Sequence, residues 1–150
     1  MSLLTPELLA NIGRTSPPRT EIVTRRDIRK YAVATGQRLE KYISGDVASA
    51  TYHVALFWDI VGMEELSADG VSVDTFLPKF PLQRAMAGGL DITYHRPIVP
   101  GDVLVATRTL SAIYEKEGSK GPLIFYEVDM EIKTDSGEPV ITEKTTRILR

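Results

Sequence analysis

The chain has 150 residues, of which 43% are hydrophobic and 25% charged, and its formal net charge is −2. This is the composition of an ordinary globular protein, and the small net charge excludes the strongly basic surface typical of nucleic-acid binding. The sequence contains no cysteine, which excludes disulfides, thiol nucleophiles and thiolate metal ligands.

At this length we expect one domain, spanning residues 1–150. No stretch approaches the roughly 18 consecutive apolar residues of a membrane helix. The N-terminal stretch MSLLTPELLANIG lacks the basic start and the small-residue cleavage site of a signal peptide. No HExxH or EF-hand spacing occurs. We therefore expect a cytoplasmic protein without a bound metal and with neither membrane nor nucleic acid as a partner.

The chain begins with a short predicted helix and a connector. Thr5 can cap this helix, Pro6 suits its first position, and Gly13 can end it. The connector over 14–20 contains two prolines and leads to a brief strand, which we expect over 20–24.

Two further helices are predicted before the middle of the chain. The segment 24–36 is a clear helix, because Thr24 and Asp27 resemble a capping box and apolar residues recur at helical spacing. A second helix is expected within 46–62. Its apolar face is formed by Val54, Phe57, Trp58 and Val61.

The last third of the chain predicts an antiparallel sheet. After a linker over 67–89, four strands are separated by the turn sequences PIVPGD, GSKG and DSGE. In the third strand, apolar residues from Ile124 to Ile132 alternate with charged ones, which is typical of a sheet with one buried face. Long antiparallel strands curve with their twist. We therefore expect an α+β domain in which the helix containing Trp58 fills the concave side of the sheet.

Three blocks of the sequence carry a family resemblance: VTRRDIRKYAVATG, GGLDITYHRPIVPGDVL and YEKEGSKGPLIFYEVDMEIKTDSGEPV. From about residue 11 onward the chain resembles the N-terminal, FAS1-like dehydratase half of the MaoC-like dehydratase family, which includes (R)-specific enoyl-CoA hydratases and 3-hydroxyacyl dehydratases. The resemblance implies a hotdog fold, in which a curved antiparallel β-sheet wraps around a central helix. It also implies a second hotdog chain as partner, in a heterodimer or heterotetramer, or otherwise in a homodimer.

Catalytic members of this family carry a signature of Gly-Asp, a short spacer, Asn-Pro-Leu and His. Their aspartate and histidine hold the water that is added to, or removed from, the double bond of the thioester. The equivalent stretch here is 35–42, with Gln37 in the place of the aspartate and Tyr42 roughly in the place of the histidine. Near neutral pH an amide cannot accept a proton and a phenol is a poor base. The resemblance therefore implies a chain with no catalytic residue of its own, which shapes the acyl pocket for a catalytic partner.

One arrangement would contradict this hypothesis: a carboxylate and an imidazole of this same chain facing each other across the acyl pocket. Two alternatives also stay open. The first is a homodimeric hotdog that binds acyl-CoA or another apolar ligand without catalysis. The second is a thioesterase-like hotdog, for which Asp46 and Asp59 are the candidate carboxylates.

Six residues are candidates for contact with a thioester carried by CoA or by acyl-carrier protein, and no other cofactor is expected. They are Tyr42, His53, Trp58, Gly88, Gly89 and Arg96. His53 is either a displaced catalytic base, acting with Asp46 or Asp59, or a structural histidine near the start of a helix. Trp58 is expected in the core or in the pocket wall.

The stretch TYHRPIVPGD either does chemistry or shapes a turn. Adjacent residues on a strand point to opposite faces, so His95 and Arg96 cannot act together on one atom. Arg96 either binds a CoA phosphate or a carboxylate of the partner, or shapes the turn that begins at Pro97. Gly88 and Gly89 either let a ligand approach closely or relieve strain where the linker enters the strand.

Overall fold

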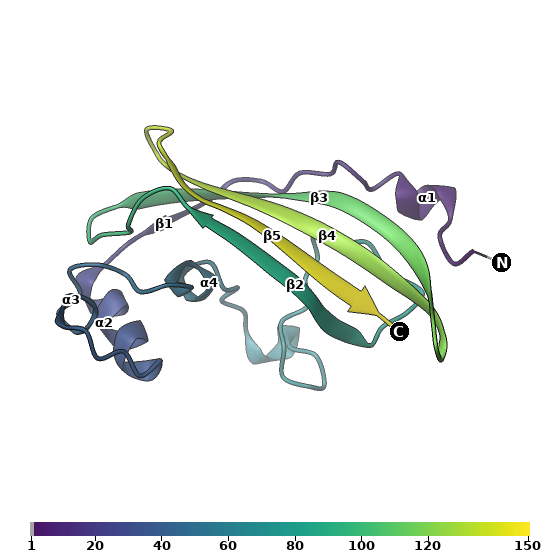
Figure 1. Ribbon diagram of the computed structural model, residues 1–150, viewed down its shortest axis with the longest axis horizontal. Helices are drawn as coiled ribbons and strands as arrows, with labels where there is room; N and C mark the ends of the chain where they lie inside the picture. Colours follow the sequence, from purple (N-terminus) through teal and green to yellow (C-terminus); the bar gives the residue numbers. More distant parts are fainter. Residues whose placement is uncertain (1) are drawn as a thin grey trace.

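A computed structural model of the chain describes residues 2–150, and it shows one antiparallel sheet with short helices beneath it (Figure 1). In chain order the elements are α1 (Pro6–Leu9), β1 (Arg19–Ile22), α2 (Arg25–Ala34), α3 (Glu40–Ile43), α4 (Tyr52–Leu56), the 3-10 helix η1 (Met63–Glu65), β2 (Ala85–Tyr94), β3 (Val103–Gly118), β4 (Gly121–Thr134) and β5 (Pro139–Leu149).

The five strands lie in the order β1-β3-β4-β5-β2, and every neighbouring pair is antiparallel. Consecutive strands β3, β4 and β5 are joined by tight turns, whereas β1 and β2 reach the two edges through longer connections. Figure 1 shows the sheet bending over α2, α3 and α4, so that its concave side faces them. The predicted curved antiparallel sheet is confirmed.

Alternation along β4 explains why one side of the sheet is buried. Tyr126, Val128 and Ile132 are buried on the concave side, while Glu127 and Asp129 point the other way. Because successive side chains of a strand point to opposite faces, this pattern fixes the register in which the sheet can pack.

Two groups of buried residues form the core. The first joins Ile28 of α2 and Tyr52 of α4 to the sheet, where Ile132 lies opposite Ala106 on one side and Ile141 on the other. The second lies toward the other end of the strands and consists of Leu8, Leu110, Ile113, Ile124, Tyr126, Val128 and Leu149. Along β4 the two groups adjoin at Val128, which belongs to the second, and Met130, which packs against the first, and both residues line the candidate functional site.

The elements predicted in the first third of the chain are confirmed. In α2, the Thr24 hydroxyl accepts a hydrogen bond from the backbone N–H of Asp27 at 3.1 Å, as a capping residue does. The helix ends at Ala34, and two residues later Gly36 has a φ of 72°, which is easily adopted only by a residue without a side chain. The brief strand and the short first helix correspond to β1 and α1.

The prediction of a long helix within 46–62 is wrong. Only Tyr52–Leu56 is helical, which gives about one and a half turns rather than a long central helix. Thr51 before it has a φ of 65°, which is not a helical conformation, and Phe57 ends it. Phe57 is buried, but Trp58 is 59% exposed and does not fill the concave side. Periodicity was misleading here because the apolar residues of this segment serve two separate surfaces.

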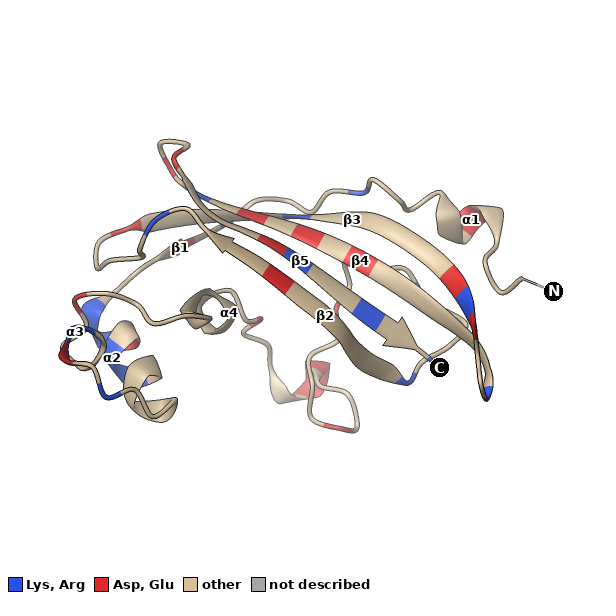
Figure 2. Cartoon of the chain, viewed as in Figure 1, with Lys and Arg blue, Asp and Glu red and all other residues tan. Residues whose placement is uncertain are grey.

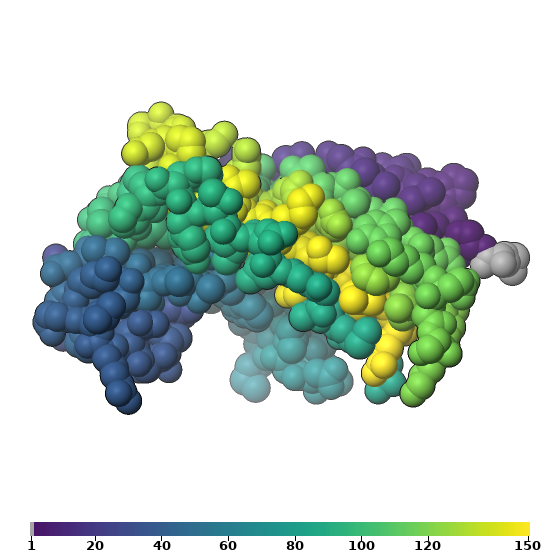
Figure 3. All heavy atoms as spheres, in the orientation of Figure 1, coloured from purple at the N-terminus to yellow at the C-terminus, as the bar shows by residue number. Residues whose placement is uncertain are grey.

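The segment between α4 and β2 takes over part of the cover that a longer helix would give. In Figure 3 it forms a lobe beneath the sheet, separated by a notch from the lobe of α2 and α3. Leu77 and Phe80 of this segment pack against the second core group. Its end was predicted too late, because β2 begins at Ala85 and not near Leu90.

Candidate functional site

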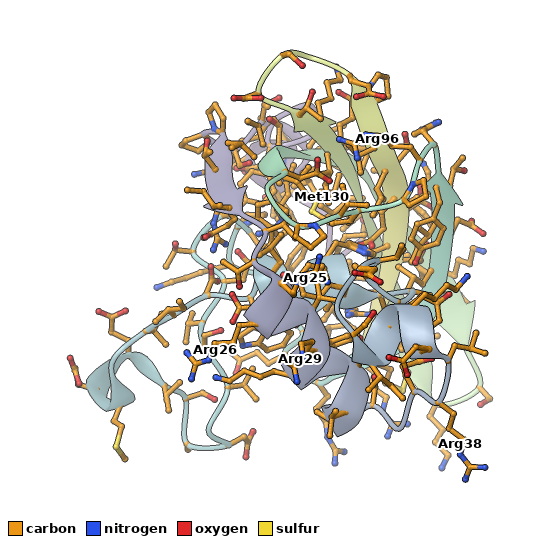
Figure 4. The ribbon with its side chains drawn as sticks, turned by 90° about the vertical axis from the view of Figure 1, so that its left-hand side faces the viewer. Arg25, Arg26, Arg29, Arg38, Arg96 and Met130 are labelled. Atoms are coloured by element: carbon orange, nitrogen blue, oxygen red, sulfur yellow. The ribbon has the colours of Figure 1, made fainter. Side chains whose placement is uncertain are left out.

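A cavity of about 280 Å³ lies on the concave side of the sheet. Its floor consists of side chains that point inward from β3, β4 and β5, and its cover comes from α4 and the segment that follows. Met130 belongs to this floor and lies in the interior of the molecule in Figure 4. The cavity mixes apolar residues with seven ionisable ones, which are Arg19, His53, Asp59, Asp74, Arg108, Glu143 and Arg147.

A histidine and a glutamate meet at the wall of this cavity. His53 Nε2 lies 2.6 Å from Glu143 Oε2, and the two side chains are only 1% and 10% exposed. Thr145 donates a second hydrogen bond to Glu143 Oε1 at 3.2 Å. Burial by itself raises the pKa of Glu143, but the hydrogen bonds from His53 and Thr145 outweigh it and leave this pKa below its usual value. Glu143 is therefore an anion at neutral pH, and His53 Nε2 is the donor.

The other ring nitrogen of His53 is buried and has no hydrogen-bond partner among residues 2–150. The ring lies edge-on to Tyr94, with centroids 6.2 Å apart. A buried imidazole that is held at Nε2 by a carboxylate presents Nδ1 as its remaining polar atom. The direct 2.6 Å contact leaves no room for a water molecule between His53 and Glu143.

Two of the three arginines in the cavity are neutralised by aspartates. Arg19 lies 2.6 Å from Asp59, and Arg108 lies 2.5 Å from Asp74. For Arg147 no ion pair is found within the part of the chain that the structure describes.

Among the six predicted contact residues, His53 and Trp58 line the cavity. The other four, Tyr42, Gly88, Gly89 and Arg96, do not, and neither does Gln37. Gln37 follows α2, where its N–H donates to the carbonyl of Ala32 at 2.9 Å. Tyr42 lies in α3, with the ammonium of Lys41 4.9 Å from the centre of its ring. Their proposed correspondence to the catalytic signature stays a prediction.

Arg96 is bound within the chain. Its guanidinium donates two hydrogen bonds to Asp102, at 2.9 and 3.0 Å, and Nε lies 3.2 Å from Glu138. Burial raises the pKa of Asp102, but the hydrogen bonds from Arg96 and from the N–H of Val99 bring it below its usual value. These contacts fasten the turn PIVPGD, which favours the structural alternative for Arg96.

Neighbouring candidates also have structural partners. His95 Nε2 lies 2.8 Å from Thr142 Oγ1 on β5. Gly88 lies in a bulge of β2, and a Cβ atom there would come within 3.0 Å of Ile148 Cγ1. A side chain at this position would crowd Ile148 and Thr146, which favours the structural alternative for Gly88.

Of the two carboxylates that were candidates for a thioesterase, only one lies at the cavity. Asp59 lies at the cavity, paired with Arg19. Asp46 lies outside it, where it accepts a hydrogen bond from Arg25.

Sequence reasoning missed the polar row that β5 presents to the cavity, which consists of Glu143, Thr145 and Arg147. These residues lie opposite Met130, Val128 and Tyr126 of β4. The signal was available in PVITEKTTRILR, because every second residue from Ile141 to Leu149 faces the concave side and the middle three are polar.

The arrangement is similar to that of several solved structures. It matches the ChsH1-ChsH2 complex from Mycobacterium tuberculosis with a TM-score of 0.70 and 17% identity, over 95% of this chain and 86% of that one. The HadBC (3R-hydroxyacyl-ACP dehydratase) complex from the same organism matches with a TM-score of 0.61 and 20% identity, over 92% of this chain and 96% of that one. A MaoC-like dehydratase from Rhodospirillum rubrum matches with a TM-score of 0.59 and 18% identity, over 92% of this chain and 91% of that one. The chain thus has the hotdog fold of the MaoC-like dehydratases, and the predicted fold class is confirmed.

The family follows from the sequence itself. The model of the family described as FAS1-like, dehydratase domain region matches residues 10–143, and the chain belongs to that family. A UPF0336 protein from Streptomyces coelicolor is 27% identical over 142 residues, which cover 93% of this chain and 92% of that protein. Within residues 2–150, no helix is long and apolar enough to cross a membrane, and no group of three potential metal ligands is found.

Proposed function

We propose that this chain is the accessory hotdog subunit of an enoyl-thioester hydratase or 3-hydroxyacyl-thioester dehydratase. In this role its cavity holds the acyl group, which CoA or an acyl-carrier protein carries, and a partner chain supplies the catalytic aspartate and histidine. The observation that carries the proposal is that residues 35–42 hold neither an aspartate nor a histidine in a chain of a dehydratase family.

The cavity supports a role in binding the acyl group. It lies on the concave side of the sheet, between α4 and the inward side chains of three strands. Apolar lining from Phe57, Ala106, Val128 and Met130 suits a hydrocarbon chain.

Two exposed surfaces support a partner chain. β2 is an edge strand of ten residues, and its outer side offers unpaired backbone groups to a second sheet. After α4, the side chains of Trp58, Ile60 and Met63 are 59%, 98% and 87% exposed, which is unusual for a chain that works alone. Two of the similar structures are complexes of two different chains, ChsH1-ChsH2 and HadBC.

Co-expression tests the proposal. The chain is purified alone and together with a hotdog chain that carries the intact Asp/His signature, and hydration of crotonyl-CoA is followed by the loss of its enoyl absorbance. We expect no hydration by the chain alone and an active complex with the partner. As a control, the partner is assayed alone and with its signature histidine replaced, which should abolish the activity of the complex.

A second candidate function rests on the contact between His53 and Glu143, a carboxylate and an imidazole of this chain that meet at the cavity wall. This pair comes near the arrangement that would contradict the accessory role, but the two groups touch directly and do not face each other across the cavity. In this alternative the chain is itself a hydratase or dehydratase, Glu143 orients the imidazole, and Nδ1 takes the proton of the attacking water. Hydration by the isolated chain that is lost in His53→Gln, with the folded protein retained, would establish this function and contradict the accessory role.

A further inference from the structure

The inward row of β5 is polar in the middle of an apolar sheet. Glu143, Thr145 and Arg147 point into the cavity, whereas Ile141 before them and Leu149 after them are buried in the two core groups. A cavity meant only for a hydrocarbon chain has no use for such a row, because polar groups that lose water without gaining a partner cost free energy.

The cavity contains three arginines and three carboxylates, and among the arginines only Arg147 has no direct ion pair within residues 2–150. Asp59 and Asp74 neutralise Arg19 and Arg108, at 2.6 and 2.5 Å. Glu143 accepts hydrogen bonds from His53 and Thr145, at 2.6 and 3.2 Å.

Arg147 remains as a half-buried guanidinium in the cavity wall, with no acidic partner among residues 2–150. A guanidinium presents a planar set of N–H donors that matches a carboxylate or a phosphate, and the interaction is stronger where water is partly excluded.

We propose that the cavity binds an anionic group of its ligand and that Arg147 is the residue that binds it. The inference rests on the proposed function in one respect, namely that the ligand is an acyl thioester. The anion then has two possible sources. One is a carboxylate at the far end of the acyl group, and the other is a phosphate of the carrier.

Neighbouring groups favour this role for Arg147. It lies opposite Tyr126, whose ring forms part of the cavity floor and stacks on Phe80 with centroids 5.0 Å apart, so the base of the site is fixed. His53 and Thr145 occupy the two carboxylate oxygens of Glu143, so the guanidinium of Arg147 keeps its N–H donors for a ligand.

The test compares ligands that differ only in charge. The dissociation constants of suberoyl-CoA, octanoyl-CoA and CoA are measured by isothermal titration calorimetry with the 150-residue chain. Suberoyl-CoA and octanoyl-CoA have acyl groups of equal length, but only the first ends in a carboxylate. Free suberate is titrated as a fourth ligand, because it needs no thioester.

Arg147→Met removes the charge and keeps much of the side-chain volume. Arg147→Lys keeps the charge without the planar donor set. The matched control is Lys144→Met, which removes a cation from the same strand but from its outer face, where Lys144 lies 3.2 Å from Glu127. Figure 2 marks the charged positions along β4 and β5.

If the carboxylate is the source, suberoyl-CoA binds at least tenfold more tightly than octanoyl-CoA, and Arg147→Met removes this preference while Lys144→Met leaves it. If the phosphate is the source, Arg147→Met weakens CoA and both thioesters about equally, by about tenfold. Arg147→Lys should be intermediate in either case.

Equal binding of all ligands by the wild type and Arg147→Met would overturn the inference but leave the proposed function intact, since thioesters would still bind. Failure of every thioester to bind would contradict the proposed function. If free suberate also failed to bind, the inference about Arg147 would be overturned as well.

Discussion

Two hydrogen-bonded side-chain pairs hold this chain together in different ways. Arg96 and Asp102 fasten a turn at the end of the sheet, and no part of this pair reaches the cavity. His53 and Glu143 join α4 to β5 across 90 positions of sequence, and both line the cavity. The first pair lies in the most distinctive stretch of the sequence and the second in two inconspicuous ones. The stretch richest in unusual residues therefore determines backbone shape, and the polar groups of the cavity lie where polar side chains interrupt an inward apolar row.

The largest effect should come from breaking the pair at the turn. Asp102→Ala leaves the guanidinium of Arg96 and the N–H of Val99 without their common acceptor, in a place where the carboxylate is 13% exposed. We expect a loss of about 3 kcal/mol in the free energy of unfolding, measured by urea denaturation. Glu138→Ala is the control, because Glu138 also contacts Arg96 but is 59% exposed, and it should cost less than about 1 kcal/mol. Equal losses would show that the turn does not depend on Asp102.

Glu143→Gln should have a smaller effect on stability. The amide keeps one acceptor oxygen, for His53, and turns its NH2 toward the Thr145 hydroxyl, which can accept, but it loses the charge that strengthens both hydrogen bonds. We expect a loss of about 1–2 kcal/mol in the free energy of unfolding. Unlike Asp102→Ala, this variant should also alter ligand affinity, because Glu143 lines the cavity. Unchanged affinity would separate Glu143 from the site.

The lowered pKa values of Asp102 and Glu143 predict that the free energy of unfolding falls in acid. Each has a pKa in the folded chain below its usual value, which is 3.8 for Asp102 and 4.5 for Glu143. A depressed folded pKa contributes stability that is complete above the usual value and is lost as the pH falls through the folded pKa. Unfolding measured from pH 6 to about pH 2 should therefore decline below about 4.5, and Glu143→Gln should decline less steeply than the wild type. A parallel decline would contradict the assigned pKa of Glu143.

Trp58→Ala should have the smallest effect on folding. With 59% of its surface exposed, Trp58 contributes little to the core, and we expect a change within about 0.5 kcal/mol. If Trp58 lay in a long central helix, as its sequence pattern predicted, the cost would be about 3–5 kcal/mol. Chemical denaturation distinguishes the two values, and Phe57→Ala, at a buried position, is the control for a large loss.

Much of the fold could be predicted from the sequence, because the patterns that determine these elements lie within short stretches of the chain. Alternation in β4, the cap at Thr24 and the turn glycine at Gly36 each fixed an element without reference to the rest of the chain. The helix around Trp58 was not accessible, since a positive φ at Thr51 and the contacts of Phe57 are set by tertiary packing.

The candidate site could be predicted only in part, because it too depends on how distant segments pack together. His53 and Trp58 were identified as candidates, but Glu143 and Arg147 were not, because their inward orientation depends on the register of β5 against β4. A one-residue shift of that register would turn both side chains outward. Only the assembled sheet brings Glu143 to His53.

The most direct test of the account is the rate of crotonyl-CoA hydration by the purified chain, before and after a hotdog chain with an intact Asp/His signature is added. The account predicts a rate no different from the buffer blank for the chain alone, and a clear rate once the two chains form a complex. Turnover by the chain alone, abolished when His53 is replaced by glutamine, would contradict it.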